Sequence, residues 1–323
     1  MRISKERLFS EAEATGFRGD VLEKVIHLLN LLETLHKHPF LKNRLALKGG
    51  TALNLFLFDL PRLSVDIDLN YVGGVEREVM LSERPKLEEA IGAVCKREGF
   101  TIRRTPTEHA GGKWLLHRLS AIGQGLNLEV DVNFMFRIPL WPLITQDSRK
   151  IGSYQARHIP MLDIHELAAG KLAALLARRT TRDLFDAHRL LTQGNLDRHR
   201  LRLAFVVYGA MNRKDWRTVS ETDVHFDVSE LKNHLFPMLR RNSAMDIREV
   251  DAWATQLVDE CRGLLGIVLP FSASEREFLD YLLDHGKIEP SLLTDNQELA
   301  ERICQHPGLK WKALNVLRYQ GDP

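Results

Sequence analysis

The sequence predicts an α/β fold, with a small mixed sheet and flanking helices in the N-terminal part and a mostly helical part behind it. Two segments, residues 64–69 (SVDIDL) and 126–136, alternate apolar and polar side chains as half-buried strands do. Residues 21–37 carry apolar side chains at helical spacing. From Asp163 onward the pattern is helical. These observations predict two domains, residues 1–160 and residues 161–323.

Composition argues against a globally basic nucleic-acid-binding protein, a protein held by disulfides or zinc, and a membrane protein. The chain has 323 residues, 44% of them hydrophobic, and a formal net charge of only +2. Any basic surface that attracts nucleic acid must therefore be local. The three cysteines are scattered without metal-ligand spacing, which favours a reducing, cytoplasmic location. The first residues lack a signal peptide's apolar core, and no stretch is apolar enough to span a bilayer, so we expect no membrane partner.

The remaining elements follow from local signals. Strands, turns and helices are expected at residues 44–48 (strand), 51–58 (a helical turn or two), 83–98 (helix), 114–122 and 126–136 (hairpin arms), 163–178 and 181–191 (helices). Three prolines make residues 138–160 look like an irregular connection between domains. Thr180 or Thr181 is expected to cap the later helix, and polar linkers are expected at 220–223 and 242–246.

Two aspartates on the first strand raise a question of charge. Because successive side chains in a strand point to opposite faces, Asp66 and Asp68 share one face while Ile67 faces the core. Two like charges so placed repel each other unless a positive charge lies nearby. The second strand of the hairpin puts a third carboxylate, Asp131, on its polar face.

Three such carboxylates suit a divalent metal ion. Mg²⁺ takes oxygen ligands from a few carboxylates and from substrate phosphates, as nucleotidyl or phosphoryl transfer requires. Gly49-Gly50, between a strand and a helical turn, lets backbone N–H groups approach a phosphate. D-x-D alone is also common on solvated strand faces, and a lone GG is more often a turn. The ordered combination favours the metal–triphosphate site.

The sequence resembles a known family at two places. K-G-G-T-A-L-N-L at residues 48–55 and P-R-L-S-V-D-I-D-L at residues 61–69 are similar to the first signature of the AbiEii/AbiGii toxins. Residues 171–191, KLAALLARRTTRDLFDAHRLL, resemble the second signature, a lysine helix followed by R-D-x-x-D. These are nucleotidyltransferase-like toxins of type IV toxin–antitoxin and abortive-infection systems, so the resemblance implies a DNA polymerase β-type nucleotidyltransferase domain followed by a helical domain that closes its cleft.

The resemblance implies roles for individual residues. Asp66 and Asp68 match the family's metal ligands, and Asp131 takes the place of the third carboxylate, a ligand or a base near the attacking hydroxyl. The residues implied near the triphosphate are Gly49, Gly50 and Ser64. Lys171 and Asp183 match the functional lysine and aspartate of the second signature.

Several residues keep a second interpretation. Arg62, just before the D-x-D strand, could contact phosphate or pair with an aspartate. Lys171 could be a phosphate ligand or a snorkelling residue on an apolar helix face, and Asp183 could be a helix-cap residue. Asp186 could pair with Arg182 or Arg189. Basic groups at residues 198–202 and 310–319 could meet RNA or be solvated faces.

The resulting hypothesis is a toxin that transfers a nucleotide from an NTP, with Mg²⁺ or Mn²⁺ as cofactor. The resemblance further implies an RNA acceptor such as the tRNA 3′ end, a block of translation, and a cognate antitoxin as partner. Two alternatives stay open. The same metal–NTP site could serve a protein kinase-like phosphoryl transfer, or the chain could be a non-catalytic nucleotide-sensing or antitoxin-binding module.

Overall fold

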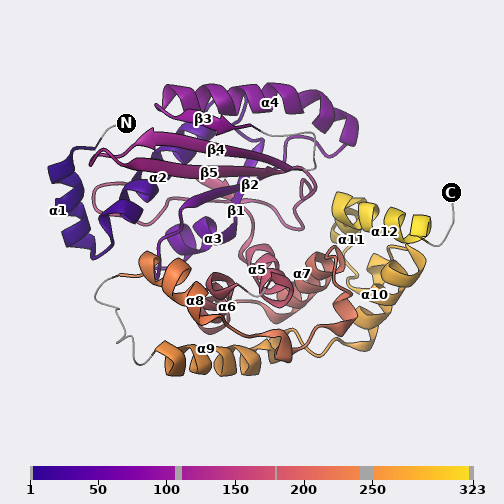
Figure 1. Ribbon diagram of the computed structural model, residues 1–323. Coiled ribbons are helices and arrows are strands. Elements are labelled where there is room, and N and C mark those ends of the chain that lie inside the picture. Colours follow the sequence, from indigo (N-terminus) through magenta and orange to yellow (C-terminus); the bar gives the residue numbers. More distant parts are fainter. Residues whose placement is uncertain (1–2, 106–110, 179, 241–249, 320–323) are drawn as a thin grey trace. The chain divides into compact units, whose positions relative to one another are not determined.

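The structure is a computed structural model that describes residues 3–105, 111–178, 180–240 and 250–319 (Figure 1). Its contacts divide the chain into two compact units. Unit 1 comprises Met1–Arg137, Leu143–Leu162 and Phe236–Ala244, and unit 2 comprises Ile138–Pro142, Asp163–Leu235 and Met245–Pro323. The domains 1–160 and 161–323 stay a prediction.

Unit 1 holds a mixed sheet. Among the described residues it has seven strands in the order β3-β4-β5-β2-β1-β7-β6. They are β1 (Leu45–Lys48), β2 (Asp66–Tyr71), β3 (Thr101–Arg104), β4 (Gly111–Leu119), β5 (Gly125–Asn133), β6 (Ile144–Gln146) and β7 (Ile159–Met161). Strand β2 runs parallel to β5 and antiparallel to β1. The predicted α/β class with a mixed sheet is confirmed, as is the β4–β5 hairpin.

The helices of unit 1 bury the apolar side of this sheet. They are α1 (Lys5–Thr15), α2 (Gly19–Lys37), α3 (Gly49–Thr51), which continues as a π-helical segment (Ala52–Leu57), and α4 (Arg77–Arg97). Helix α2 contacts β2, β5 and β7, while α4 contacts α2 and β3, and Figure 1 shows α4 running beside β3. Helix α2 matches the prediction, because its apolar stripe is fully buried.

Helix α4 begins earlier than the sequence predicts. The sequence predicts a start near Glu83, but the helix begins at Arg77 and runs through Pro85. Tertiary contacts stabilise its first turns. The Glu83 carboxylate accepts hydrogen bonds from the Tyr71 hydroxyl at 2.7 Å and from the Arg44 guanidinium at 2.7 and 2.9 Å.

The prediction of an irregular connection at residues 138–160 is wrong in part. Strands β6 and β7 form there, and β7 lies parallel to β1, with Leu47 opposite Met161. Each strand has three residues, too few to show an alternation, and Pro160 in the middle of β7 argues against a strand. Pairing with β1, including Leu162 N–H to the Leu47 carbonyl at 3.1 Å, decides the structure instead.

A segment from far along the chain completes unit 1. The carbonyl of Met238 accepts a hydrogen bond from the N–H of Leu63 at 2.8 Å, two residues after Pro61 and just before β2. The Arg240 guanidinium lies 5.1 Å from the centroid of the buried Phe17 ring. Residues 236–240 thus belong to the wall of unit 1.

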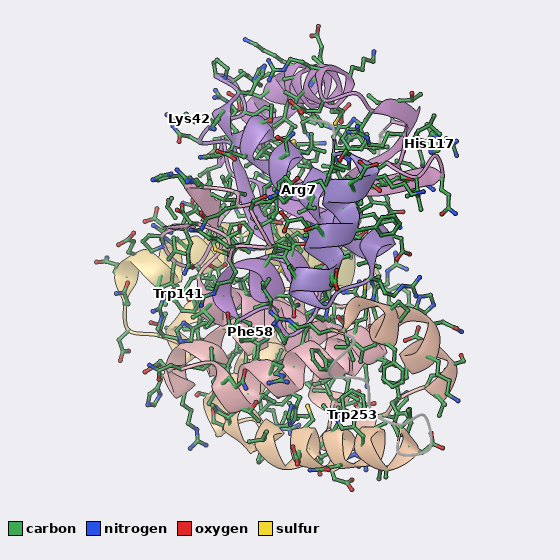
Figure 2. All side chains as sticks on the ribbon, turned by 90° about the vertical axis from the view of Figure 1, so that its left-hand side faces the viewer. Arg7, Lys42, Phe58, His117, Trp141 and Trp253 are labelled. Atoms are coloured by element: carbon green, nitrogen blue, oxygen red, sulfur yellow. The ribbon has the colours of Figure 1, made fainter. Side chains whose placement is uncertain are left out.

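Unit 2 is helical. Its main helices are α5 (Ile164–Arg178), α6 (Thr181–Gln193), α7 (Arg198–Ala210), α8 (Val228–Glu230), α9 (Val250–Leu264), α10 (Ala273–His285), α11 (Gln297–Gln305) and α12 (Pro307–Tyr319). Helix α5 packs on α6 and α7, and α6 packs on α9. The ring of Trp253 of α9, labelled in Figure 2, lies 6.4 Å from the ring of Phe185 of α6. The helices predicted at 163–178 and 181–191 are confirmed.

Three smaller predictions have mixed outcomes. Thr180 is the N-cap of α6, as one of the two predicted candidates. The expected linker at 220–223 contains a short 3-10 helix, Glu221–Asp223, and the linker at 242–246 lies outside the described residues. Within the described part of the chain, none of the helices combines the length and the apolar character needed to cross a membrane.

Glu166 ties the segment 138–142 to α5 within unit 2. Its buried carboxylate accepts hydrogen bonds from the backbone N–H groups of Leu140 (3.0 Å) and Trp141 (3.2 Å) and from the Tyr208 hydroxyl (2.9 Å). Burial raises the pKa of Glu166 to about 7, because these donors offset only part of the cost of burying the charge.

This arrangement predicts a pH-dependent stability. The pKa of Glu166 is raised in the folded state, so its contribution is fully present below the unfolded pKa near 4.5 and is lost as the pH rises through 7. Between pH 5 and pH 8 the free energy of unfolding should therefore fall by about 2–3 kcal/mol more in the wild type than in Glu166→Gln. Urea unfolding of both proteins at each pH measures this difference. Parallel pH profiles would contradict it.

Candidate active site

The candidate site is a row of charged side chains across the sheet of unit 1. Asp68 of β2 lies directly opposite Asp131 of β5 and, on its other side, opposite Lys48 of β1. Asp131 lies in turn opposite Lys113 of β4. Directly paired residues point to the same face of a sheet. We call this set, Lys48, Asp68, Asp131 and Lys113, the charged row.

The charged row answers the question of repulsion. Burial raises the pKa of Asp131, and the charge of Asp68 adds to the rise, whereas Lys48 and Lys113 lower it. Lys113 also pairs with Glu129, at 2.5 Å between Nζ and Oε2. The two lysines at the ends of the row therefore offset part of the repulsion between the two carboxylates at its centre.

Asp66 is the first residue of β2 and lies two residue pairs before the charged row. Its register partner on β5 is Glu129, and its carbonyl accepts a hydrogen bond from the Thr51 hydroxyl at 2.5 Å. Asp66 and Asp68 are half-buried, while Ile67 between them is fully buried. The predicted alternation of β2 is thus confirmed, with both aspartates on the polar face.

Gly49 brings the backbone close to Asp68. Its φ of +73° lies in the left-handed region, and a Cβ atom at this position would collide with the Asp68 carboxylate. Glycine is therefore required for two reasons, conformation and space. The neighbouring Gly50 offers its carbonyl to the Asn54 side-chain amide at 2.9 Å.

The two remaining predicted residues of unit 1 are buried. Ser64, two residues before Asp66, is 8% exposed. Arg62 is 3% exposed, and its guanidinium donates a hydrogen bond to the Leu63 carbonyl at 2.9 Å. Arg62 thus interacts with the backbone that leads into β2.

The carboxylates fit a metal ion that is shared with a substrate. Among the described residues, no three histidine, cysteine, aspartate or glutamate side chains gather closely enough to hold an ion by themselves. Mg²⁺ is commonly held by one or two carboxylates with phosphates and water completing its shell. Asp66 and Asp68 supply that kind of hard oxygen donor, and both are half-buried on the polar face of β2. The residues therefore fit such an ion.

Unit 2 brings together the residues of the second signature. The Lys171 ammonium lies 2.8 Å from Asp183 Oδ1 and 3.0 Å from Asp186 Oδ2. The Thr180 hydroxyl donates to the other oxygen of Asp183 at 2.8 Å. All three charged side chains are at most 10% exposed. Lys171 thus links α5 to α6 through a buried ion-pair cluster.

Charge compensation keeps Asp183 ionised. Burial alone would raise its pKa, but Lys171, with smaller contributions from Arg178 and Thr180, brings the pKa of Asp183 below its ordinary value. Asp186, for which the sequence offered an ion pair with Arg182 or Arg189, pairs with Lys171 and is the most buried member of the cluster. The spacing of three residues between Asp183 and Asp186 puts both carboxylates on one face of α6, where both reach Lys171.

Comparison with known proteins identifies the family. A sequence model described as the nucleotidyl transferase AbiEii toxin of the type IV toxin–antitoxin system matches residues 30–278. The chain belongs to the AbiEii toxin family. The match confirms the resemblance seen in the two signatures. Membership of this family makes the chain a nucleotidyltransferase toxin.

A solved structure supports the fold of this AbiEii-family toxin. MenT4, a nucleotidyltransferase toxin from Mycobacterium tuberculosis H37Rv, matches with a TM-score of 0.61 at 18% sequence identity. The match covers 94% of this chain and 98% of the MenT4 chain. A search of curated proteins found no match. At this identity the likeness to MenT4 concerns the fold.

The charged row depends on Gly49, which gives a testable comparison. Gly49→Ala should destabilise the AbiEii-family toxin by more than the ~1–2 kcal/mol that a left-handed alanine costs, because the new methyl group also collides with Asp68. Gly123→Ala is the matched control, since its φ is +80° but a Cβ there meets no atom within 4 Å. Urea unfolding measures both. Equal losses in the two variants would contradict the close approach.

The ion-pair cluster predicts a large stability effect. Lys171→Met leaves Asp183 and Asp186 buried without their cation, so the free energy of unfolding at pH 7 should fall by about 3–5 kcal/mol. Because the pKa of Asp183 is lowered in the folded state, its contribution is present above the unfolded pKa and is lost as the pH falls. The gap to the wild type should therefore shrink in acid.

The control for this cluster is Lys310→Met, which removes an exposed lysine of α12. It should change the free energy of unfolding by less than about 0.5 kcal/mol. Thermal or urea unfolding at pH 7 and pH 4 separates the two variants. A Lys171→Met protein as stable as Lys310→Met at pH 7 would contradict the structural role of the cluster.

Proposed function

We propose that this toxin transfers a nucleotide from an NTP to RNA with the aid of Mg²⁺, and that the acceptor is the 3′ end of tRNA. The observation that carries the proposal is the register of the sheet, which places Asp68 beside Asp131 with the backbone of Gly49 against Asp68. Modification of the tRNA end would block translation and growth. The reaction class rests on the family, and the acceptor rests on the resemblance.

Asp66 and Asp68 are the proposed metal ligands, with Mn²⁺ as a possible replacement for Mg²⁺. When bound, the ion neutralises negative charge on the triphosphate and on the pyrophosphate that leaves. Asp131 is proposed to accept the proton of the attacking hydroxyl. Burial and the nearby Asp68 raise its pKa, and a carboxylate with a raised pKa is a better base near neutral pH.

Other residues are proposed to position the triphosphate. Gly49 and Gly50 allow the backbone to approach a phosphate, and Ser64 lies just before β2. The hydrogen bond from Arg62 to the Leu63 carbonyl supports a role in holding the backbone that leads into β2. A contact between Arg62 and phosphate stays part of the proposal. Such positioning lowers the barrier because the reacting groups meet without a further loss of freedom.

Lys171 and Asp183 keep the functional roles that the resemblance implies. Their buried pairing supports a pre-set orientation for the ammonium, since both oxygen partners come from the next helix. An ammonium held in this way can act as a point charge toward phosphate without first losing rotamer freedom. We further propose a cognate antitoxin as partner and the cytoplasm as location, because the family belongs to type IV toxin–antitoxin systems.

The test is label transfer to RNA. Purified protein is incubated with Mg²⁺, total bacterial tRNA and each α-³²P-labelled NTP in turn. We expect labelled tRNA with at least one NTP, together with pyrophosphate release. Asp66→Asn, Asp68→Asn and Asp131→Asn should each lower the rate about a hundredfold or more, because each removes a charge at the reacting centre. EDTA should abolish transfer.

Asp59→Asn is the matched control, because it neutralises an exposed aspartate of unit 1 outside the charged row. It should keep the wild-type rate. Label that passes from γ-³²P-NTP to a protein, without pyrophosphate, would replace the proposal by kinase chemistry. NTP binding without transfer of either label would replace it by a non-catalytic nucleotide-sensing or antitoxin-binding role.

A further inference from the structure

Unit 2 contains a pocket of its own, with a volume of about 860 Å³. The first turns of α7 and α10, the segments 266–272 and 292–294, and Leu299 of α11 form its walls. Trp141, which Figure 2 labels, also contributes to the lining. A volume of this size lies in the range of pockets that hold small organic ligands.

The walls of this pocket carry more positive than negative charge. Arg198, His199, Arg200 and Arg202 all line it, and Glu275 is the acidic lining residue within the described chain. Glu275 is already paired with Arg202, at 2.5 Å. Arg200 is paired with Asp163 at 3.1 Å, whereas Arg198 makes no ion pair with any described residue. The pocket therefore suits an anion.

The position of the basic residues strengthens this inference. Arg198, His199 and Arg200 occupy the first turn of the 13-residue helix α7, and the N-cap carboxylate of Asp197, which accepts a hydrogen bond from the Arg200 N–H at 2.9 Å, is the acidic group beside them. Cations near the positive end of a helix dipole are unfavourable, each by some tenths of a kcal/mol. One carboxylate, that of Asp197, stands against three basic side chains at this helix end, so the local charge stays positive. A bound anion would turn the same charges into a favourable set.

Trp141 and Arg200 give one wall of the pocket two stacked planar groups, an indole ring and a guanidinium. The Arg200 guanidinium lies 4.4 Å from the centroid of the Trp141 ring, and its buried Nε atom has no hydrogen-bond partner. Nucleobases stack on aromatic rings and on guanidinium planes of this kind. Leucines on the other walls, Leu203, Leu269, Leu292, Leu293 and Leu299, supply the apolar surface that a base can contact.

We propose that this pocket binds a phosphorylated nucleoside unit. Its phosphate lies at Arg198 and His199, and its base lies against the apolar wall beside the Trp141–Arg200 layer. A free nucleotide and an unpaired nucleotide of an RNA chain offer the same chemistry. The pocket is formed entirely by residues of unit 2 and is separate from the charged row in sequence and in unit, so the inference does not rest on the proposed reaction.

The test is RNA binding without catalysis. A 5′-phosphorylated, unstructured RNA octamer with a 3′ fluorescein is titrated with Asp68→Asn protein in EDTA and without NTP, and anisotropy gives Kd. Introducing Arg198→Glu into the Asp68→Asn protein should raise the Kd for the octamer at least tenfold. Adding Arg213→Glu, the same charge change at an exposed arginine of unit 2 outside the pocket, should change Kd less than twofold. Equal weakening by both would overturn the proposal.

A second variant separates entry into the pocket from general attraction. Leu293→Trp fills the pocket without a change of charge, and it should also raise Kd at least tenfold. Unchanged RNA binding by Leu293→Trp would overturn the proposal. Because the assay contains no metal or NTP, a failure of the label-transfer experiment leaves this result unaffected.

Competition identifies the source of the nucleotide. If a nucleoside 5′-monophosphate displaces the octamer and Leu293→Trp abolishes this displacement, free nucleotides enter the pocket. If the monophosphate does not compete while both pocket variants weaken RNA binding, the ligand is a nucleotide within RNA. A fluorescent peptide of leucine and glutamate tests for an acidic protein partner. If this peptide binds, if Arg198→Glu abolishes its binding, and if the RNA octamer does not bind, the proposal is overturned in favour of such a partner.

Discussion

The parallel pairing of β2 with β5 is the constraint on which the candidate active site depends. It places Asp68 next to Asp131, at a cost in repulsion that the chain offsets with Lys48 and Lys113 on the strands outside them. A shift of one residue in this register would turn the β5 carboxylates toward the apolar side of the sheet. The buried residues Ile67, Val130 and their neighbours therefore fix the chemistry as well as the fold.

Sequence patterns identify the elements of this site but not their register. The alternation in residues 64–69 and 126–136 shows which aspartates are polar-face residues, and it is right for Asp66, Asp68 and Asp131. It cannot show that Asp68, rather than Asp66, faces Asp131, because that depends on which strands pair. Lys48 and Lys113 became visible only with the pairing. Strands β6 and β7 were missed because three residues carry no period.

Unit 2 shows the same division between local and tertiary information. The sequence locates the Lys171 helix and the R-D-x-x-D helix, and their close packing explains why both aspartates meet one lysine. The arginine-lined pocket could not be derived, because its walls come from Trp141, from residues 198–203, from residues 266–275 and from residues 292–299. The sequence shows the four basic residues as a group, but only their surroundings distinguish a pocket from a solvated face.

The hydrogen bond between Leu63 and Met238 has a consequence for synthesis on the ribosome. The strand that carries both metal-binding candidates is entered through Leu63, and the partner of that residue is made about 175 positions later. A nascent chain that has not reached Met238 lacks this part of the wall of unit 1. This AbiEii-family toxin thus completes unit 1 only when most of the polypeptide exists, and chains that end before Met238 do not contain unit 1 in full.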